Sequence, residues 1–397
     1  MPLDLTRTLA DLVSLPSVNP MGRDVSGDIY FEHRVTDYLQ QLFTRLGLPW
    51  QRHTVAPQRD NIIAKLDGKV RPEQGGKVVL LEAHQDTVPI DGMIIDPFKP
   101  DIKDGRMYGR GSCDIKGGMV AMLGALARLI EKRPDDCPTV IMACTVNEEH
   151  GFSGATALTK LWLEQRDSIV PRRPDMAVIA EPTSLNVVIA HKGTVRWRAT
   201  TRGRAAHSSQ PHLGENAIYK MSRVLQAFEA YARDVAPAQP EHKWCGKATL
   251  SVGLISGGIS VNTVPDRCTI EIDRRVLPTE NPADVYKQAV EFINRFPGVD
   301  GAVEHESPFI QGPSLPDTDN GDLAAKLGAV AADVCGRGKQ MGVPYGTDAS
   351  TIARSGVPSV VFGPGSIDQA HTIDEWLPLD ELTQASEVLY QFICRGV

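Results

Sequence analysis

The spacing of hydrophobic and polar residues predicts alternating strands and helices over the first half of the chain. Apolar side chains recur at helical intervals over residues 28–46, and Gly47 is a typical residue to follow a helix end. A second helix is predicted over residues 115–132. Short continuous apolar runs predict strands buried on both faces, at 77–83, 139–146 and 175–182. Strands and helices in this order indicate a parallel sheet covered by helices.

The pattern changes after about residue 187, where a second kind of architecture begins. Residues 187–204 have the pattern of extended chain, and two alternating strands are predicted at 248–258 and 263–276. Helices are predicted at 216–233 and 282–296. Two helices on an antiparallel sheet form an α+β unit of ordinary small-domain size.

The chain after this unit returns to the first pattern. A stretch rich in Pro, Gly and Asp, residues 307–322, predicts a linker, and residues 359–363 predict another buried strand. The sequence therefore predicts an α/β fold in which one domain is inserted into another. We expect residues 1–187 and 307–397 to form the larger domain, with a mostly parallel sheet, and residues 188–306 to form the inserted α+β domain.

Composition and charge narrow the classes of protein that fit. At about 150 residues per domain, 397 residues suggest two to three domains. Hydrophobic residues make up 42% and charged residues 23%, which is typical of a soluble globular protein. The 42 basic residues against 49 acidic ones give a formal charge of −7, which predicts no binding to nucleic acid or to an anionic membrane.

The cysteines and the N-terminus predict a cytoplasmic protein. The seven cysteines are an odd number without a C-x-x-C pair, which is typical of free thiols in a reducing compartment. Asp4 and Asp11 stand where a secretory signal would need basic and then apolar residues. No apolar stretch approaches the roughly 20 residues that span a bilayer.

Candidate metal ligands and catalytic groups follow the predicted strands. His84 and Asp86 come directly after the first strand, where ligands gather in parallel α/β sheets. A neutral imidazole binds zinc well and a nearby carboxylate orients it, although a histidine and an aspartate can equally cap a strand. Glu148 and Glu149 follow the strand at 139–146. Two adjacent carboxylates there need compensating charge if they are buried, and need none if they lie in a solvated loop.

The segment GRGSCDIKGG, residues 109–118, matches a nucleotide-binding loop only in part. Asp114 stands in place of the third glycine, and the lysine spacing of a phosphate loop is missing. The glycines on both sides would let the backbone pack closely around the Asp114 carboxylate. Alternatively, the segment is a tight strand-to-helix turn in which Asp114 caps the helix.

Two further candidates complete a set of five. Glu181 lies at the end of the strand at 175–182, and His371 lies in a loop punctuated by Gly and Pro. Two histidines and three carboxylates that all follow strands of one domain suit a pair of zinc-like ions with one bridging carboxylate. The set consists of His84, Asp114, Glu149, Glu181 and His371.

Six segments, in order along the chain, resemble the signatures of one family. They are LLEAHQDTVP, YGRGSCDIKGGM, NEEHG, AEPTS, GRAAHSS and GPGSIDQAH, and they span about residues 78–375. The chain thus resembles the family of acetylornithine deacetylase, succinyl-diaminopimelate desuccinylase, aminoacylase and carboxypeptidase G. This resemblance implies a dinuclear-zinc α/β catalytic domain with an inserted α+β dimerisation domain, and hence a homodimer.

The resemblance also implies the roles of the site residues. The five residues above would be the metal ligands, with Asp114 bridging the two ions. Asp86 would orient His84, and Glu148 would be the general base. His207, in GRAAHSS, would reach the active site of the partner subunit and stabilise the tetrahedral oxyanion. Without the resemblance, His207 is better interpreted as an ordinary loop histidine.

Three more residues resemble positions that contact the substrate. Asn262 and Arg274 would hold its carboxylate, a group that suits the planar guanidinium of arginine. Thr347, in the segment GTDAS at 346–350, would line the same pocket. Each of the three could equally be a strand-surface or turn residue.

These roles predict the metal-dependent hydrolysis of an amide bond. Glu148 would take a proton from a water that two divalent ions polarise, and these ions would be zinc or else cobalt or manganese. The tetrahedral oxyanion would be held by one ion and by His207, and Glu148 would return the proton to the leaving nitrogen.

The segments AEPTSLNVVIAHKG and GPGSIDQAHTIDEWL look closest to acetylornithine deacetylases, and Glu181 resembles the deacylase and carboxypeptidase members. We therefore expect deacylation of N-acyl-L-amino acids, with N-acetyl-L-ornithine as the leading substrate and arginine biosynthesis as the pathway. The alternatives are a succinyl-diaminopimelate desuccinylase and an exopeptidase, such as a carboxypeptidase or a dipeptidase. A non-catalytic binding homologue would have no need of Glu148 beside a complete ligand set.

Overall fold

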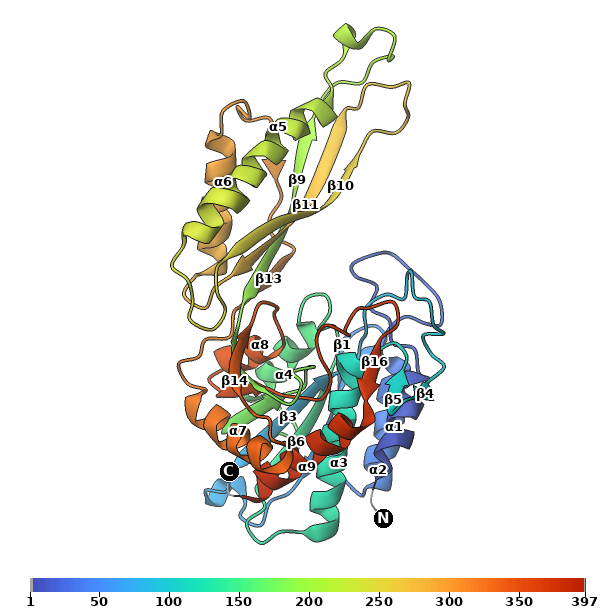
Figure 1. Ribbon diagram of the computed structural model, residues 1–397, viewed down its shortest axis with the longest axis vertical. Coiled ribbons are helices and arrows are strands. Elements are labelled where there is room, and N and C mark those ends of the chain that lie inside the picture. The colour runs from blue at the N-terminus through green and yellow to red at the C-terminus, as the bar shows by residue number, and fades with distance from the viewer. Residues whose placement is uncertain (1–2, 396) are drawn as a thin grey trace. The chain divides into compact units, whose positions relative to one another are not determined.

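The computed structural model describes residues 3–395 and 397, and the chain divides into two compact units (Figure 1). The first unit comprises Met1–Ile189, Asp317–Met341 and Thr347–Val397. The second unit comprises Ala190–Pro316 and Gly342–Gly346, so its chain interrupts that of the first. The sequence pattern predicts these two boundaries after residues 187 and 306. The predicted fold class, an α/β domain with an inserted α+β domain, is confirmed.

The described part of the first unit is built around an eight-stranded sheet in the order β1-β2-β6-β3-β7-β15-β8-β14. The four strands in the middle, β6, β3, β7 and β15, run parallel to one another. The strands are β1 (Trp50–Ala56), β2 (Arg59–Leu66), β3 (Val78–His84), β6 (Thr139–Thr145), β7 (Met176–Ile179), β8 (Val187–His191), β14 (Gln340–Val343) and β15 (Ser359–Val361). Every residue of β3 and β6 is buried, as their continuous apolar sequence predicts.

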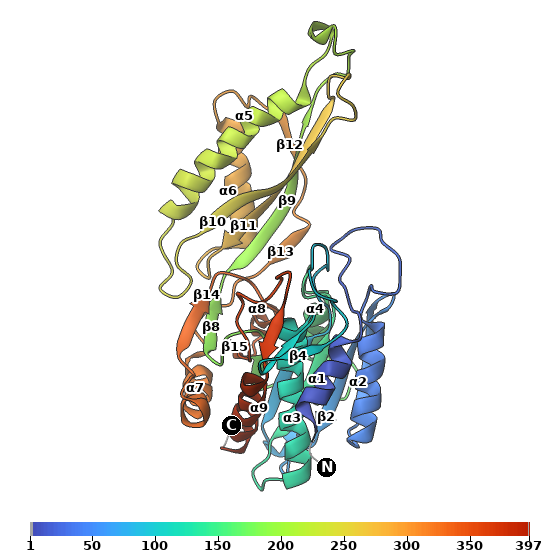
Figure 2. The same ribbon diagram turned by 45° about the vertical axis from the view of Figure 1, so that its right-hand side comes forward.

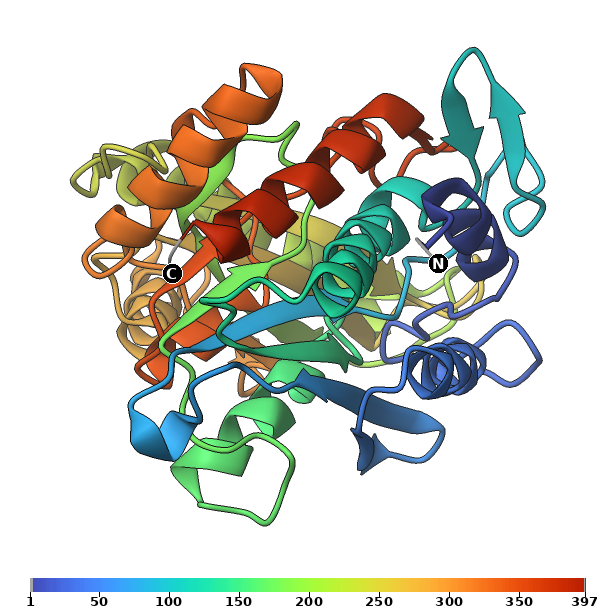
Figure 3. The same cartoon turned by 90° about the horizontal axis from the view of Figure 1, so that it is seen from below.

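Helices cover both faces of this sheet (Figure 3). One face carries α3 (Gly117–Lys132), α9 (Leu379–Cys394) and α7 (Gly321–Cys335), and α1 (Leu5–Val13) packs against α3. The other face carries α4 (Ser153–Leu163), with α8 (Ala349–Arg354) beside it. Helix α2 (His33–Arg45) packs against β2. A small antiparallel sheet joins β4 (Asp101–Lys103), β5 (Arg106–Tyr108) and β16 (Trp376–Pro378).

Two helices of the first unit begin later than their sequence pattern predicts. Helix α2 begins at His33 instead of at residue 28, because Phe31 has a φ of 65°, which a helix cannot accommodate. Helix α3 begins at Gly117 instead of at residue 115, because Asp114 and Ile115 have non-helical dihedral angles. In both places the non-helical residues lie just before the helix. The residues there include Glu32, which precedes α2, and Asp114, which precedes α3.

The second unit is an antiparallel sheet with two helices on one face (Figure 2). Its strands are β9 (Gly193–Arg202), β10 (Thr249–Gly257), β11 (Arg267–Val276), β12 (Val303–His305) and β13 (Ile310–Gly312). Its helices are α5 (Ala217–Ala230) and α6 (Pro282–Arg295). Strand β11 alternates buried and half-buried residues, which is the pattern of a sheet covered on one face.

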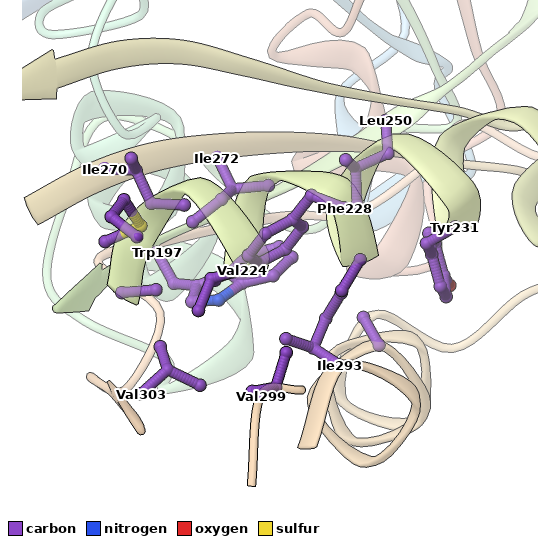
Figure 4. Close-up of a cluster of buried hydrophobic side chains, with 14 of the residues drawn as sticks. Trp197, Val224, Phe228, Tyr231, Leu250, Ile270, Ile272, Ile293, Val299 and Val303 are labelled. Atoms are coloured by element: carbon purple, nitrogen blue, oxygen red, sulfur yellow. The ribbon is translucent and has the colours of Figure 1, made fainter. Parts of the chain in front are cut away.

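The core of the second unit lies between this sheet and its helices (Figure 4). Trp197 of β9 is fully buried there and meets the ring of Tyr286 edge-on, with 5.5 Å between the ring centroids. Its indole N–H donates a hydrogen bond to Nδ1 of His305, 3.2 Å away. The unit therefore has a hydrophobic core of its own.

No helix in the described part of either unit is both long enough and apolar enough to cross a membrane.

Candidate metal centre

Five of the residues predicted from the sequence are brought together at one edge of the parallel strands. His84 is the last residue of β3, Glu149 follows β6, and Glu181 follows β7. Because these three strands are parallel neighbours, their carboxyl ends meet at the same edge, where ligands bind in α/β sheets. Asp114 and His371 reach this edge from loops that precede α3 and β16.

The five side chains form two groups of three that share one member. Nε2 of His84 lies 3.2 Å from Oδ1 of Asp114 and 3.9 Å from Oε1 of Glu181. Nε2 of His371 lies 3.2 Å from Oδ2 of Asp114 and 3.4 Å from Oε2 of Glu149. Within each group the potential ligand atoms all lie within 4.8 Å of one another. Asp114 thus presents one oxygen to each group, as a carboxylate bridging two cations would.

The hydrogen-bonding state of these side chains tests whether they fit metal ions. His84, Asp114 and Glu181 are buried, whereas the His371 side chain is half exposed. Among the described residues, Nε2 of His84, Oδ1 of Asp114 and Oε1 of Glu149 are buried without a hydrogen-bond partner. Leaving such atoms unsatisfied costs free energy. A cation bound to each group would satisfy all three atoms, so the donor set fits two divalent metal ions.

The pKa shifts in the cluster show the same demand for positive charge. Burial, together with repulsion from Asp114, raises the pKa of both Glu149 and Glu181 above the usual range. Burial would lower the pKa of His371, but Asp114 and Glu149 outweigh it and raise that pKa to about 11. Burial would raise the pKa of Asp114, but His371 and His84 hold it below its usual value. These directions are the ones expected where closely packed carboxylates favour a nearby positive charge.

Asp86 contacts both His84 and the two neighbouring glutamates. Nδ1 of His84 donates a hydrogen bond to the backbone carbonyl of Asp86, 2.9 Å away, and this leaves Nε2 available as a ligand. The Asp86 carboxylate lies 3.7 Å from that nitrogen. It instead accepts the backbone N–H groups of Glu148, at 3.1 Å, and Glu149, at 3.2 Å. Asp86 thus orients His84 through its main chain and the two glutamates through its side chain.

Glu148 is buried but belongs to neither group of potential ligands. Burial and repulsion from Glu181 raise its pKa well above the ordinary carboxyl value. A buried carboxyl with a raised pKa next to two groups of potential metal ligands is a candidate for a general base, and this role of Glu148 stays a prediction.

Several residues outside the predicted set support the site. The amide of Asn19 donates to the Asp86 carboxylate at 2.7 Å, and buried Glu32 accepts the backbone N–H of Asn147 at 3.2 Å. Glu375 accepts four hydrogen bonds from residues 110–114. Nothing in the local sequence around Asn19, Glu32 or Glu375 identifies a hydrogen-bond partner so distant along the chain.

Two predicted residues of the second unit lie on neighbouring loops. The backbone N–H of Ser208 donates to the carbonyl of Asn262 at 3.0 Å, so this contact brings the His207 and Asn262 loops together. Both side chains are exposed. The N–H of Ser209 donates to Nδ1 of His207 at 3.1 Å. Because Nδ1 is an acceptor, the neutral imidazole carries its proton on Nε2, which is then a hydrogen-bond donor.

Arg274 and Thr347 have partners of their own. Arg274 is buried in the second unit, where its guanidinium is 2.7 Å from the Glu280 carboxylate and also donates to the carbonyl of Arg275. Thr347 is buried in the first unit, where its hydroxyl oxygen accepts the N–H of Ala349 at 3.1 Å, at the start of α8. The contacts of Arg274 are those of a structural ion pair, and substrate binding by either residue stays a prediction.

This chain is similar in sequence and in fold to known metallopeptidases and deacylases. The model of peptidase family M20/M25/M40 matches residues 80–395. An acetylornithine deacetylase of Myxococcus xanthus is 29% identical and covers 90% of this chain and 91% of its own. A probable succinyl-diaminopimelate desuccinylase of Staphylococcus aureus is 28% identical and covers 94% and 92%. The fold is that of an M20 family metallo-carboxypeptidase from Sulfolobus solfataricus, with a TM-score of 0.77, 18% identity and 99% of each chain covered.

Proposed function

The chain belongs to peptidase family M20/M25/M40, and from that premise we propose that it deacylates N-acyl-L-amino acids, with N-acetyl-L-ornithine as its leading substrate. At the coarser level it is a metal-dependent hydrolase of acyl amino acids or peptides. The observation that carries the proposal is the position of Asp114 between two groups of ligands, with buried Glu148 beside them.

His84, Asp114 and Glu181 would hold one divalent ion, and Asp114, Glu149 and His371 would hold the other. Nitrogen and carboxylate ligands suit zinc, and cobalt or manganese would also fit them. Two such ions, when bound, would supply positive charge that polarises a water molecule and the carbonyl group of the amide to be hydrolysed.

The other site residues would guide protons and charge. Glu148 would accept a proton from the attacking water and deliver it to the leaving nitrogen. His207 would reach the active site of the partner subunit and donate from Nε2 to the developing oxyanion, which is consistent with the bond from the Ser209 N–H to its Nδ1. Asn262 and Arg274 would contact the substrate carboxylate, for which Arg274 would have to exchange its bond to Glu280. Thr347 would also contact the substrate.

The choice of substrate rests on the relatives and on one ligand. A deacetylase and a desuccinylase are similar to this chain at nearly the same identity, so both acyl groups must be tested. Glu181, as a ligand, resembles deacylases and carboxypeptidases. If N-acetyl-L-ornithine is the substrate, the enzyme would belong to arginine biosynthesis and would act in the cytoplasm. An exopeptidase with the same metal site is the second candidate.

A panel of substrates tests this proposal. We expect zinc- or cobalt-loaded protein to hydrolyse N-acetyl-L-ornithine with a higher kcat/KM than N-succinyl-diaminopimelate, other N-acetyl amino acids or a dipeptide. Faster turnover of the succinyl substrate or of the dipeptide would replace the deacetylase proposal while keeping the catalytic groups. If two metals bind but no amide is hydrolysed, the proposal of an enzyme is wrong.

The second unit supports a homodimer. Strand β10 stands at the edge of its sheet, where its outer backbone groups can pair with another strand. Leu254 and Ile255 on this strand are more than half exposed, and Ile259 and Val261 in the following loop are almost fully exposed. Such an apolar edge is a liability in a monomer. We propose that a second copy covers it.

Replacing Ile255 tests this interface. We expect Ile255→Lys to convert a wild-type dimer into a monomer of 43.2 kDa in sedimentation or light-scattering measurements. Lysine on an edge strand opposes pairing with another strand. Ile102→Lys is the matched control, because Ile102 is similarly exposed on a strand of the first unit. A wild-type monomer, or an Ile255→Lys variant as dimeric as the control, would contradict the proposal.

A further inference from the structure

The carboxylate of Glu375 is fully buried, and both of its oxygens face the loop that carries Asp114. Oε1 accepts the backbone N–H groups of Cys113 and Asp114, each at 2.9 Å. Oε2 accepts the backbone N–H of Gly111 at 2.9 Å and the Arg110 guanidinium at 2.7 Å. One side chain thus satisfies four donors within five consecutive residues, and charge-assisted hydrogen bonds of this kind are strong.

The loop needs such an anchor because its backbone is irregular. Gly111 has a φ of +81°, and a Cβ atom added there would lie 2.8 Å from a side-chain carbon of Thr87. Asp114 has φ −121° and ψ 92°, directly before α3 begins. Residues Ser112–Lys116 form a single irregular π-helical turn, closed by the bond from the Lys116 N–H to the Gly111 carbonyl at 2.9 Å, and the N–H of Asp114 inside this turn donates to Glu375.

Glu375 also connects the loop to the segment that carries His371. It lies four residues after His371 and directly before β16, which pairs with β5 through Trp376 and Tyr108. The N–H of Gly109 donates to the Glu375 carbonyl at 3.0 Å. The main chain and the side chain of Glu375 therefore bind both ends of the turn from which Asp114 projects.

We propose that Glu375 is a positioning residue that holds Asp114 between the two metal positions. This inference rests on the proposed function, because it assumes that Asp114 is the shared ligand. Glu375 acts through the main chain of its neighbours and is not itself a ligand. The role requires a carboxylate, because each of its oxygens accepts two donors. In a glutamine, the –NH2 group would face N–H donors, and it cannot accept a hydrogen bond from them.

Metal affinity provides a test that does not depend on activity. Outer-shell substitutions typically reduce metal affinity or activity by about 10- to 100-fold. We expect Glu375→Gln to bind Zn²⁺ about 10- to 100-fold more weakly than the wild-type chain, in titrations of chelator-treated protein against a competing zinc indicator. Co²⁺ titrations should also show an altered absorption spectrum, because the geometry of the shared ligand changes. If Glu375→Gln does not fold, Glu375→Asp takes its place, with the same expected direction.

Asp175→Asn is the matched control. Asp175 also accepts a backbone N–H, that of Val78 at 2.7 Å, and an arginine, Arg172 at 2.6 Å, but it does so at the opposite end of β3. We expect Asp175→Asn to lower the unfolding temperature without changing zinc affinity. Wild-type zinc affinity and an unchanged cobalt spectrum in the Glu375 variant would overturn the inference. If the wild-type chain itself binds no pair of metals, the proposed function fails instead.

Discussion

Glu148→Gln is expected to lower kcat by about 100- to 10,000-fold, the usual contribution of a general acid–base group. Glutamine has nearly the same shape as glutamate, but its amide cannot accept a proton from water or return it to a leaving nitrogen. Glu148 lies outside both groups of potential ligands, so the metal content should not change. The measurement is the steady-state rate on the best substrate of the panel, with metal content determined on the same sample.

Glu149→Gln is the natural counterpart, because it makes the same chemical change one residue further along. Glu149 belongs to the ligand group of His371 and Asp114, so its replacement should weaken metal binding as well as activity. The two variants together separate proton transfer from metal binding. Near-full activity of Glu148→Gln with both metals bound would show that another group is the base.

The sequence predicts those parts of the fold that depend on local pattern. Strands β3 and β6 are buried at every residue, and their continuous apolar runs were sufficient to predict them and the polar residues that follow. Helix α1 and the hairpin of β1 and β2 were not predicted. Strand β1, WQRHTVA, is half-buried and mostly polar, so it lacks both a continuous apolar run and a clear alternation.

The supporting contacts of the site could not be predicted, because they join residues distant in the sequence. Glu375 bonds to Asp114 across 261 positions, and this contact accompanies the late start of α3. Asn19 reaches Asp86 across 67 positions. In neither hydrogen bond does a periodic sequence pattern mark the donor or the acceptor. Arg274 illustrates a different difficulty, since an arginine suited to a substrate carboxylate is equally suited to Glu280, six residues away.

Asp114→Asn should weaken both metal sites at once, because Asp114 is the one residue common to the two ligand groups. Asparagine keeps the size of the side chain but offers a neutral oxygen and an amide nitrogen, which cannot bridge two cations as a carboxylate does. We expect the loss of affinity to exceed the roughly 10- to 100-fold typical of outer-shell changes. Zinc stoichiometry and affinity, measured by calorimetry on chelator-treated protein, provide the test.

Glu181→Gln is the control for this prediction. Glu181 belongs only to the group of His84, so this variant should lose affinity for one ion and retain the other. A two-step binding curve in the wild type would become one strong step in Glu181→Gln and none in Asp114→Asn. If Asp114→Asn kept one strong step, the two sites would not share this carboxylate. The bridging assignment would then be wrong, although the general base could still be Glu148, because the two assignments rest on separate contacts.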